Sequence, residues 1–434
     1  MKLENIKGTF DYSKKEQEIR EYIKDTLKSI FKRYGYSPLE TPILCYYDLL
    51  ALKYDKDDEI LKEIYKATDQ GKRNLGLRYD LTVPFAKFIV MKKDLRLPFK
   101  KYEIGEAFRD GPVKLGRNRQ FVQCDVDVVG LEGQVIEAEL ISLFVKGFNK
   151  FNIPIEIKYN SRNIMQGLIE ELDIADIDTS NIIKVIDKME KISGDPFMQE
   201  LDILGIDSNK QKTLMEYFSM NFNELLIKFK DSNNSTLVKG INEIKALNEL
   251  LDYQNLGKYM EFTPTLARGQ EYYTGNVFEV YALNSNVKCS IGSGGRYDNL
   301  ITNWIGDGNK YPAVGISFGL DVIYEVLKEK GDLKDINFIN IYIIPINTYK
   351  ETLDIADKIR DLGLNVEIEM KKIKIKKCFE YANKENIPFV IVIGEDELIN
   401  KIIKIRNMET GIETSTPLCY LNEIKNIVLD KDNI

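Results

Sequence analysis

Histidine is absent from this chain of 434 residues. Its absence excludes every mechanism that needs a histidine base, a histidine nucleophile or a histidine metal ligand. The five cysteines are scattered and form no CxxC pair, which argues against a zinc cluster and against a thiol-redox pair. No apolar run reaches the ~18 residues of a membrane span. We therefore expect a protein with no bound metal of its own and no membrane partner, in the reducing cytoplasm.

Without histidine, the reactive side chains that remain are those of Arg, Lys, Asp, Glu and Tyr. This set suits the handling of anions such as phosphates, where positioning and charge stabilisation dominate. The net charge is −7, yet residues 91–120 hold nine Lys or Arg against four acids, and residues 371–377 hold five lysines. Local basic patches let an acidic protein bind a polyanion. For the lysines of 371–377 alone, a solvated helix face is the simpler interpretation.

The pattern of apolar and polar residues changes along the length of the chain. Hydrophobic residues make up 44% and charged residues 30%, which suits a globular protein of two or three domains. Residues 161–257 are predicted to form a mostly helical insert, and the glycine-rich stretch at 292–295 to form a loop. After residue 330, apolar strand runs alternate with helical stretches, which predicts a small, mainly parallel α/β domain. The predicted domains are therefore 1–335 and 336–434.

Two segments alternate in polarity with the period of a β-strand, and a turn containing glycine and proline separates them. One face of this pair is apolar and consists of Tyr102, Ile104, Phe108, Val122, Cys124, Val126 and Val128. The other face carries Arg109, Gln123, Asp125 and Asp127. The pattern predicts a long antiparallel hairpin with its connection at 110–118. A purely structural sheet more often has Thr, Lys and Glu on its polar face, so we interpret this face as a binding site.

Four segments carry distinctive sequences. They read FRDGPVKLGRNRQFVQCDVDVVG at 108–130, LARGQEYYTG at 266–275, GSGGRYDNL at 292–300 and YANKENIPFVIVIGEDEL at 381–398. In this order and spacing they resemble the histidine–tRNA ligases among the class II aminoacyl-tRNA synthetases. The first is similar to the second class motif, the next two to stretches peculiar to the histidine enzymes, and the last to their anticodon-binding domain. The opening KGTFDY and its following helix look like the dimerisation motif of the family.

This resemblance implies a fold and an activity. The fold would be an α+β catalytic domain with an antiparallel sheet of the class II synthetase type, a helical insert, and a C-terminal α/β anticodon-binding domain. The activity would be the ATP-dependent attachment of histidine to tRNA(His) through histidyl-adenylate. The resemblance further implies Mg²⁺ with the ATP, and a homodimer.

The resemblance also assigns residues to the site. Arg109 and Arg268 would be the catalytic cations, because the carboxylate of histidine and the α-phosphate of ATP must be held together. The residues implied in histidine binding are Asp80, Thr82, Arg109, Gln123, Asp127, Arg268, Tyr272 and Tyr273. Of these, Asp80, Thr82 and Gln123 match the positions for the ammonium, and Asp127 and Tyr273 those for the imidazole. The residues expected at ATP or tRNA are Arg117, Arg119 and Arg296.

One position departs from the family pattern. Where the third class motif usually carries an arginine that grips ATP, this chain has Val322. A second function therefore stays open, that of a non-ligating relative which binds histidine and resembles the regulatory subunit of ATP phosphoribosyltransferase. The retained histidine-site residues and the C-terminal domain argue against it. A class II ligase for another amino acid is a third interpretation, and the segments 266–275 and 292–300 argue against that one.

Overall fold

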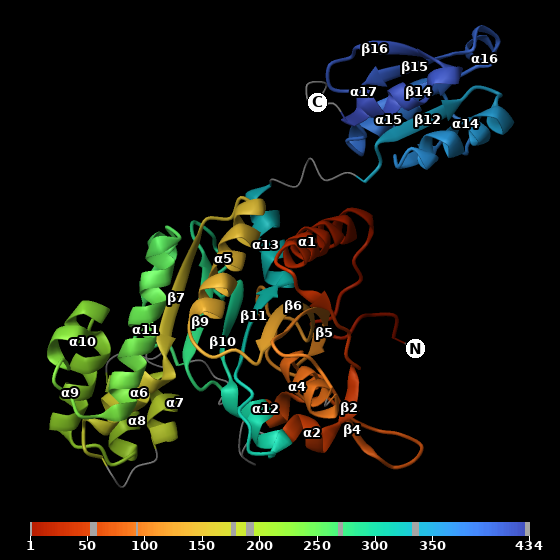
Figure 1. Cartoon of the computed structure of the whole chain (residues 1–434). Helices are drawn as coiled ribbons and strands as arrows, with labels where there is room; N and C mark the ends of the chain where they lie inside the picture. Colours follow the sequence, from red (N-terminus) through yellow and green to blue (C-terminus); the bar gives the residue numbers. More distant parts are fainter. Residues whose placement is uncertain are drawn as a thin grey trace. The chain divides into compact units, whose positions relative to one another are not determined.

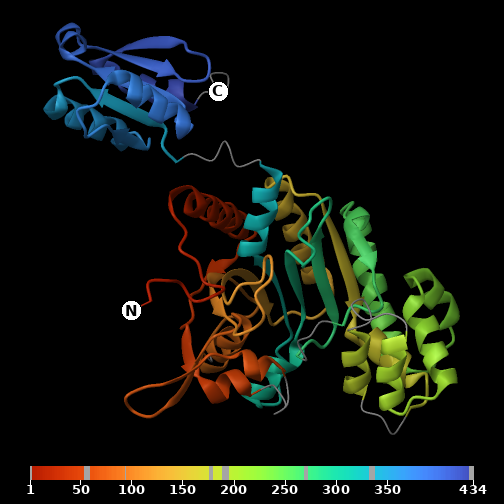
Figure 2. The same cartoon turned by 180° about the vertical axis from the view of Figure 1, so that it is seen from behind.

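The chain divides by its contacts into two compact units (Figures 1 and 2). A computed structural model describes residues 2–52, 59–92, 94–174, 179–187, 195–267, 272–331 and 338–429. The large unit comprises Met1–Asp11 and Arg20–Lys330, and the C-terminal unit comprises Tyr12–Ile19 and Gly331–Ile434. The predicted boundary between residues 335 and 336 lies outside the described residues.

An eight-stranded sheet forms the centre of the large unit, with the order β1-β5-β6-β11-β10-β9-β7-β8. Neighbouring strands are antiparallel except at the two edges, where β1 pairs with β5 and β7 pairs with β8 in parallel. The strands are β1 (Ser37–Pro38), β5 (Phe99–Phe108), β6 (Gln120–Val129), β7 (Ile155–Ser161), β8 (Met260–Phe262), β9 (Asn276–Ala282), β10 (Gly292–Arg296) and β11 (Ala313–Gly319).

Three helices cover one face of this sheet and are seen together in Figure 1: α1 (Lys14–Arg33), α5 (Val135–Lys150) and α13 (Leu320–Lys330). Phe318 of β11 is fully buried beneath them. Its ring centroid lies 5.8 Å from that of Phe31 on α1, and 4.9 Å and 5.1 Å from those of Phe144 and Phe148 on α5. Aromatic packing of this kind makes one face of the sheet an apolar core.

The opposite face of the sheet is covered at one end by two shorter helices, α4 (Thr82–Met91) and α12 (Asp298–Ile305), which pack on each other. Beside them lies a three-stranded sheet in the order β2-β4-β3, with β2 (Leu44–Tyr46), β3 (Lys66–Thr68) and β4 (Asn74–Leu77). Two short helices flank it, α2 (Tyr47–Ala51) and α3 (Glu59–Glu63). Since these elements leave part of the face uncovered by helix, a cavity can form there.

The segment predicted to be a helical insert contains six α-helices within its described part, and a short 3₁₀ helix begins at its last residue. They are α6 (Arg162–Glu170), α7 (Thr179–Ile186), α8 (Asp195–Ile203), α9 (Ser208–Ser219), α10 (Phe222–Lys228), α11 (Ser235–Tyr253) and η1 (Gly257–Tyr259). Helices α6 and α11 pack closely because Gly167 and Gly240 lie at their contact; a Cβ on Gly167 would come within 2.6 Å of the backbone of Leu237.

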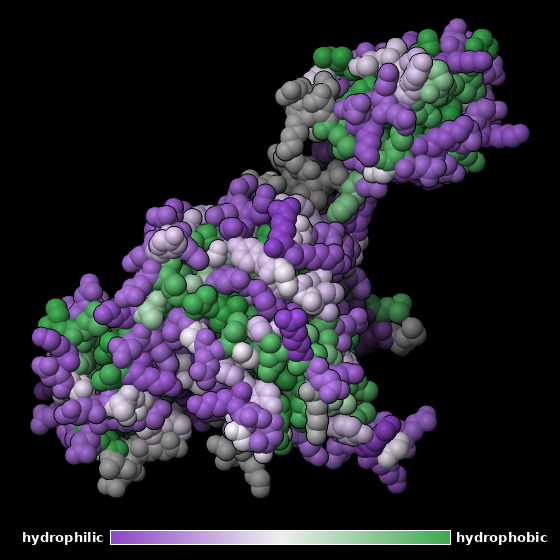
Figure 3. All heavy atoms as spheres, viewed as in Figure 1, coloured by the Kyte–Doolittle hydropathy of each residue, from purple (hydrophilic) through white to green (hydrophobic). Residues whose placement is uncertain are grey.

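The C-terminal unit is a five-stranded sheet in the order β13-β12-β14-β15-β16. Strands β13, β12 and β14 are parallel, and β15 and β16 add antiparallel. Its strands are β12 (Ile341–Pro345), β13 (Val366–Ile368), β14 (Phe389–Ile393), β15 (Ile402–Asn407) and β16 (Glu413–Pro417). Its helices are α14 (Tyr349–Asp361), α15 (Ile375–Lys384), α16 (Glu395–Asn400), α17 (Asn422–Leu429) and the short η2 (Leu418–Tyr420). In the view of Figure 3, hydrophilic side chains spread over the surfaces of both units, and smaller apolar areas lie among these side chains.

The predicted hairpin is present as β5 and β6, paired from Phe99 opposite Val129 to Phe108 opposite Gln120. The glycine-rich stretch, in contrast, is strand β10 and not the predicted loop. It lies between β9 and β11, and a Cβ on Gly294 would collide with the carbonyl oxygen of Gly315 on the neighbouring strand. Glycines here allow close packing inside a sheet, a requirement that the pattern of a single strand does not reveal.

Candidate active site

A cavity of about 320 Å³ opens on the face of the sheet opposite the aromatic core. Its walls come from β6, β10 and β11, the start of α4, and the turn between β5 and β6. The predicted residues that line it are Asp80, Thr82, Arg109, Arg117, Gln123, Asp127, Tyr272 and Tyr273. Arg119 and Arg296 do not line it, and Arg268 lies outside the described residues. The fold thus brings together segments that are far apart in the chain.

Arg109 directly follows the last residue of β5. Its Nε donates to the carbonyl oxygen of Tyr79 at 3.1 Å, and its guanidinium carbon lies 5.0 Å from the centroid of the Phe121 ring. These contacts hold the side chain against the cavity wall. Within the described part of the chain, its two Nη atoms donate no hydrogen bond. They are therefore available to an anionic ligand, for which a guanidinium is well suited.

Oxygen acceptors gather where α4 begins. Asp80 is buried, and its Oδ1 accepts the backbone N–H of Val83 at 3.0 Å, which fixes the carboxylate at the first turn of the helix. Thr82 is the first residue of α4. Across the cavity wall, the Gln123 amide nitrogen donates to the Ser317 hydroxyl at 3.2 Å, and its Oε1 has no hydrogen-bond partner among the described residues. Such acceptors suit a cationic group like an ammonium.

Asp127 is held from two sides. The hydroxyl of Tyr297 donates to its Oδ1 at 2.6 Å, and the Nζ of Lys101 forms an ion pair with its Oδ2 at 2.7 Å. Space for the carboxylate depends on Gly315, since a Cβ there would collide with Oδ1 of Asp127. Asp127 is 2% exposed, and the position of its carboxylate is therefore set by these neighbours.

Buried carboxylates outnumber buried cations around the cavity. The buried acidic side chains are Asp80, Glu103, Asp125 and Asp127, and the buried basic ones are Arg78 and Lys101. Arg78 Nη1 pairs with Glu103 Oε1 at 2.9 Å. Burial raises the pKa of Asp125 to about 8; the attraction of Lys101 lowers it in part, and the repulsion of Asp127 raises it further. With Asp125 largely protonated at neutral pH, the three carboxylates of Asp80, Glu103 and Asp127 still outnumber the two buried cations, which favours a ligand that carries a positive group.

Three tyrosines form an aromatic wall. The ring centroids of Tyr272 and Tyr273 are 4.7 Å apart, and those of Tyr272 and Tyr297 are 5.8 Å apart in an edge-to-face arrangement. Gly295 allows this packing, because a Cβ there would lie 2.8 Å from the ring of Tyr273. The wall is apolar in its body and polar at its hydroxyls, which suits a small heteroaromatic ring.

Val322 lies on another part of the cavity wall, beside the hairpin turn. A Cβ on Gly116 would come within 3.3 Å of Val322 Cγ1 and 3.1 Å of Cys289 Sγ. The position that departs from the family pattern therefore faces the cavity, and it contributes no charge there.

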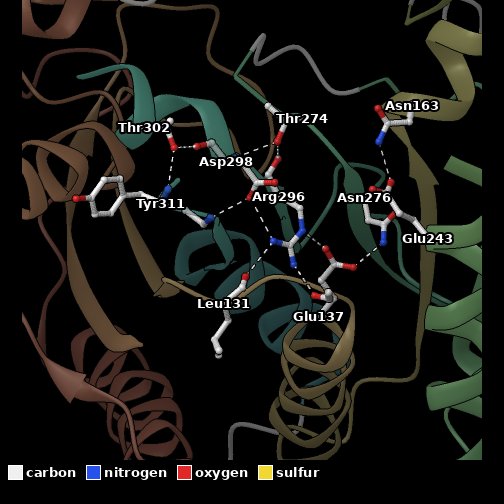
Figure 4. Close-up of polar contacts among 12 residues, drawn as sticks. Leu131, Glu137, Asn163, Glu243, Thr274, Asn276, Arg296, Asp298, Thr302 and Tyr311 are labelled. Atoms are coloured by element: carbon white, nitrogen blue, oxygen red, sulfur yellow. Dashed lines mark hydrogen bonds and ion pairs between the residues drawn. The ribbon is translucent and has the colours of Figure 1, made fainter. Parts of the chain in front are cut away.

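Arg296 lies outside the cavity, in the network of Figure 4. Its Nε donates to Glu137 Oε1 at 2.7 Å, and its Nη atoms donate to Asp298 and to the carbonyl oxygens of Leu131 and Gly133. The sequence predicts this residue at ATP or tRNA, but the structure directs its guanidinium at protein acceptors. It links α5 to the end of β10, directly before a tyrosine of the cavity wall.

The two arginines of the hairpin turn differ in position. Arg117 lines the cavity and is exposed, with an ion pair to Glu63 at 2.9 Å. Arg119 lies outside the cavity and pairs with Asp110 at 3.2 Å. Both contacts are open to solvent, so a phosphate could compete for either arginine at little cost.

Sequence reasoning did not single out Lys101, Asp125 or Tyr297 as site residues. A signal for Lys101 was present, since antiparallel partners share a face and Lys101 is opposite Asp127. Tyr297 lies in the distinctive segment 292–300 but no pattern marks its direction. The strand pattern puts Asp125 on the polar face but indicates no role for it.

Comparison with known proteins places this geometry in context. The histidyl-tRNA synthetase family model matches residues 8–323, and an anticodon binding domain model matches residues 340–425. The histidine–tRNA ligase 1 of Bacillus cereus is 45% identical over 425 residues, which cover 98% of this chain and 97% of that protein.

Two solved structures share the fold. The histidyl-tRNA synthetase of a Nostoc species superposes with a TM-score of 0.84 at 26% identity, and covers 98% of this chain and 99% of its own. A Bacillus halodurans protein described as an ATP phosphoribosyltransferase regulatory subunit/histidyl-tRNA synthetase has a TM-score of 0.73 at 20% identity, over 90% of this chain and 98% of its own. At that identity only the fold is comparable. The predicted fold class is confirmed.

Proposed function

This chain belongs to the histidyl-tRNA synthetase family, and on that premise we propose that it attaches histidine to tRNA(His), with ATP, through histidyl-adenylate. The resemblance and the enzyme class predicted from the sequence are confirmed by the family model and the 45% identical ligase. The non-ligating alternative is not favoured, because the similar proteins that match nearly the whole chain are named as ligases.

One observation carries the proposal. The cavity combines a guanidinium whose Nη atoms donate to no described residue, on Arg109, with a surplus of buried carboxylates and an aromatic wall. An amino acid with a cationic ammonium and a polar ring needs the carboxylates and the tyrosines, and its own carboxylate needs the guanidinium. We assign the ammonium to Asp80, Thr82 and Gln123, and the imidazole to Asp127 and Tyr273.

The first step in this proposal joins two anions. The histidine carboxylate attacks the α-phosphorus of ATP, a P–O bond forms, and the bond to the pyrophosphate oxygen breaks. Arg109 stabilises the negative charge that builds up on the phosphoryl oxygens. Arg268 is assigned the same role from the family resemblance, and Arg117 is assigned to the nucleotide phosphates. In the second step the terminal ribose of the tRNA takes the histidyl group and AMP leaves.

Mg²⁺ enters this scheme with the triphosphate, as part of the substrate. Among the described residues no group of three or more Cys, Asp or Glu side chains is placed to hold a metal ion. The phosphate oxygens of ATP are themselves the oxygen ligands that Mg²⁺ prefers.

We assign catalysis to residues 1–335, with the insert at 161–257, and anticodon binding to residues 336–434. The lysines of 371–377 support the second assignment. Lys371, Lys372 and Lys374 are exposed and line a hollow of about 300 Å³ at the ends of β12 and β13. Ammonium groups at such a place can neutralise RNA phosphates.

We further propose a homodimer in the cytoplasm. The dimer rests on the family resemblance of the opening segment, and the exposed apolar side chains of Leu44 and Tyr46 on β2 are of the kind that a second copy covers. Sedimentation equilibrium would measure the mass. The cytoplasmic location fits the five free cysteines. No helix among the described residues has the length and apolarity to cross a membrane.

Pyrophosphate exchange tests the proposed function. The purified chain should exchange labelled pyrophosphate into ATP only when histidine is present, and it should charge a tRNA(His) transcript. Exchange without a preference for histidine would contradict the assignment of the substrate. Histidine-dependent exchange without any charging would favour a protein that activates histidine for another acceptor.

A further inference from the structure

A lysine without exposed surface lies behind the carboxylate of Asp127. Lys101, on β5, is 0% exposed and lies opposite Asp127 in the pairing of β5 with β6. Its Nζ is 2.7 Å from Asp127 Oδ2. Neither step of the proposed reaction uses this lysine. Burying an ammonium is unfavourable unless neighbouring groups compensate its charge.

The neighbours of Lys101 compensate its charge. Asp127 and Asp125 approach from β6, Glu103 from its own strand, and the ring of Phe85 on α4 has its centroid 4.7 Å from Nζ. Burial alone would lower the pKa of Lys101, but the three carboxylates raise it by more, and the net effect is a raised pKa. The side chain is therefore a permanent cation directly behind Asp127, which lines the cavity.

This cation acts on the one carboxylate that it touches. Oδ2 of Asp127 faces Lys101, and Oδ1 accepts the hydroxyl hydrogen of Tyr297 at 2.6 Å. The hydrogen bond on Oδ1 and the ion pair on Oδ2 hold the carboxylate in place, and it remains an acceptor. Each oxygen keeps a further lone pair, which can take an N–H from a ligand in the cavity.

We propose that Lys101 is a positioning residue for histidine specificity, which fixes Asp127 as the hydrogen-bond acceptor for a ring N–H of the substrate. This inference rests on the proposed function. A site built around such an acceptor rejects a ring of the same size that lacks the N–H, because the carboxylate is then left without its donor.

A purely structural role for Lys101 would have a different signature. In that case its loss would lower stability and weaken every ligand of the cavity alike. A positioning role affects only ligands with a ring N–H. Thienylalanine separates the two, because its five-membered ring resembles that of histidine in size and has no N–H.

The experiment compares wild type with Lys101→Met, which keeps the length of the side chain and removes the charge. The full-length chain is assayed by pyrophosphate exchange. We expect the KM for histidine to rise at least tenfold, while the KM for ATP and the inhibition constant of thienylalanine stay within about twofold. Equal weakening of histidine and thienylalanine, or no change in the KM for histidine, would overturn the proposal.

Arg20→Met is the matched control. Arg20 is also buried and pairs with Asp321 at 2.6 Å, but neither residue lines the cavity. Its loss should lower thermal stability and leave the KM for histidine within about twofold. If Lys101→Met does not fold, Lys101→Gln replaces it, with the same split expected because it also removes the charge. A wild type without histidine-dependent exchange would refute the proposed function itself, a result distinct from the failure of Lys101 variants to change KM.

Discussion

The sheets of the two units are built on opposite principles. Around the eight-stranded sheet, the large unit buries charged side chains, among them Lys101, Glu103 and Asp127. In the C-terminal unit the buried polar residues are Thr348, Thr352 and Thr416, and no charged side chain is buried among its described residues. Both faces of its inner strands β12 and β14 are apolar instead.

This difference distinguishes a unit with an internal binding site from a unit that binds through its exposed surface. Buried ion pairs contribute little net stability, because desolvation offsets their attraction. Their value lies in holding fixed dipoles and charges where a small substrate binds. A polyanion such as RNA needs only exposed ammonium groups on a stable support, which the apolar core of the C-terminal unit provides. The following experiments separate the two units.

The largest effect is expected for Arg109→Gln in the large unit. Histidine-dependent pyrophosphate exchange should fall by about 10²- to 10³-fold, because a preorganised cation next to the reacting phosphorus is lost. Arg360→Gln is the control from the C-terminal unit, where Arg360 pairs with Asp357 at the surface, and it should change exchange less than twofold. Equal losses in both variants would refute the assignment of Arg109.

A smaller effect, confined to RNA, is expected for the triple change of Lys371, Lys372 and Lys374 to Ala. The affinity for tRNA should weaken by about tenfold or more. The negative slope of log affinity against log salt should become shallower by about 2, as counterion release predicts for three lost phosphate contacts. Filter binding at several salt concentrations measures both. Pyrophosphate exchange should remain unchanged. A tRNA affinity equal to that of wild type would indicate that these lysines form a solvated surface and do not contact RNA.

A still smaller effect, on stability, is expected from the raised pKa of Asp125, which is about 8 in the folded chain. Its pKa in the unfolded chain is about 3.9, so the folded state binds the proton more tightly between these values. The free energy of unfolding of the large unit should therefore decrease as pH rises from about 4 to about 8. Asp125→Asn should flatten this dependence.

Urea unfolding followed by tryptophan fluorescence makes that measurement specific. The chain has one tryptophan, Trp304, which packs in the large unit against the cluster that contains Tyr273 and Tyr297. The signal therefore reports on the large unit alone. An Asp125→Asn variant with the same pH dependence as wild type would show that another group causes it.

The smallest effect is expected for Val322→Arg. A guanidinium at this place on the cavity wall should lower the KM for ATP by about three- to tenfold, since a partly solvated charge-assisted hydrogen bond contributes about 1 kcal/mol. Val322→Leu, which adds volume and no charge, is the control and should leave or raise this KM. An Arg variant that behaves like the Leu variant would indicate that the nucleotide does not approach Val322.

Parts of the site could be predicted because strand alternation is a local property, and because the order of the distinctive segments can be read directly from the sequence. The period-two pattern placed Gln123 and Asp127 on the polar face of the hairpin, and the pairing of β5 with β6 agrees. The role of the glycines in β10 could not be predicted, because it depends on a neighbouring strand. Arg296 shows the same limit, since only its acceptors on α5 and α12 direct it away from the cavity.

The order of the residues along the chain was enough to establish the hairpin and the alternating C-terminal strands, because each depends on neighbours in sequence. It was also enough for the family, because the order and spacing of the distinctive segments can be read without the fold. Which charges meet inside the large unit depends on strands and helices that pair across long intervals of the chain. Lys101 and Asp127 face each other, and Tyr297 joins them, because an antiparallel register and a helix start bring three segments to one point. Strand alternation indicates that Lys101 and Asp127 share a face, but the contact with Tyr297 and the Coulomb attraction at such short range exist only after folding.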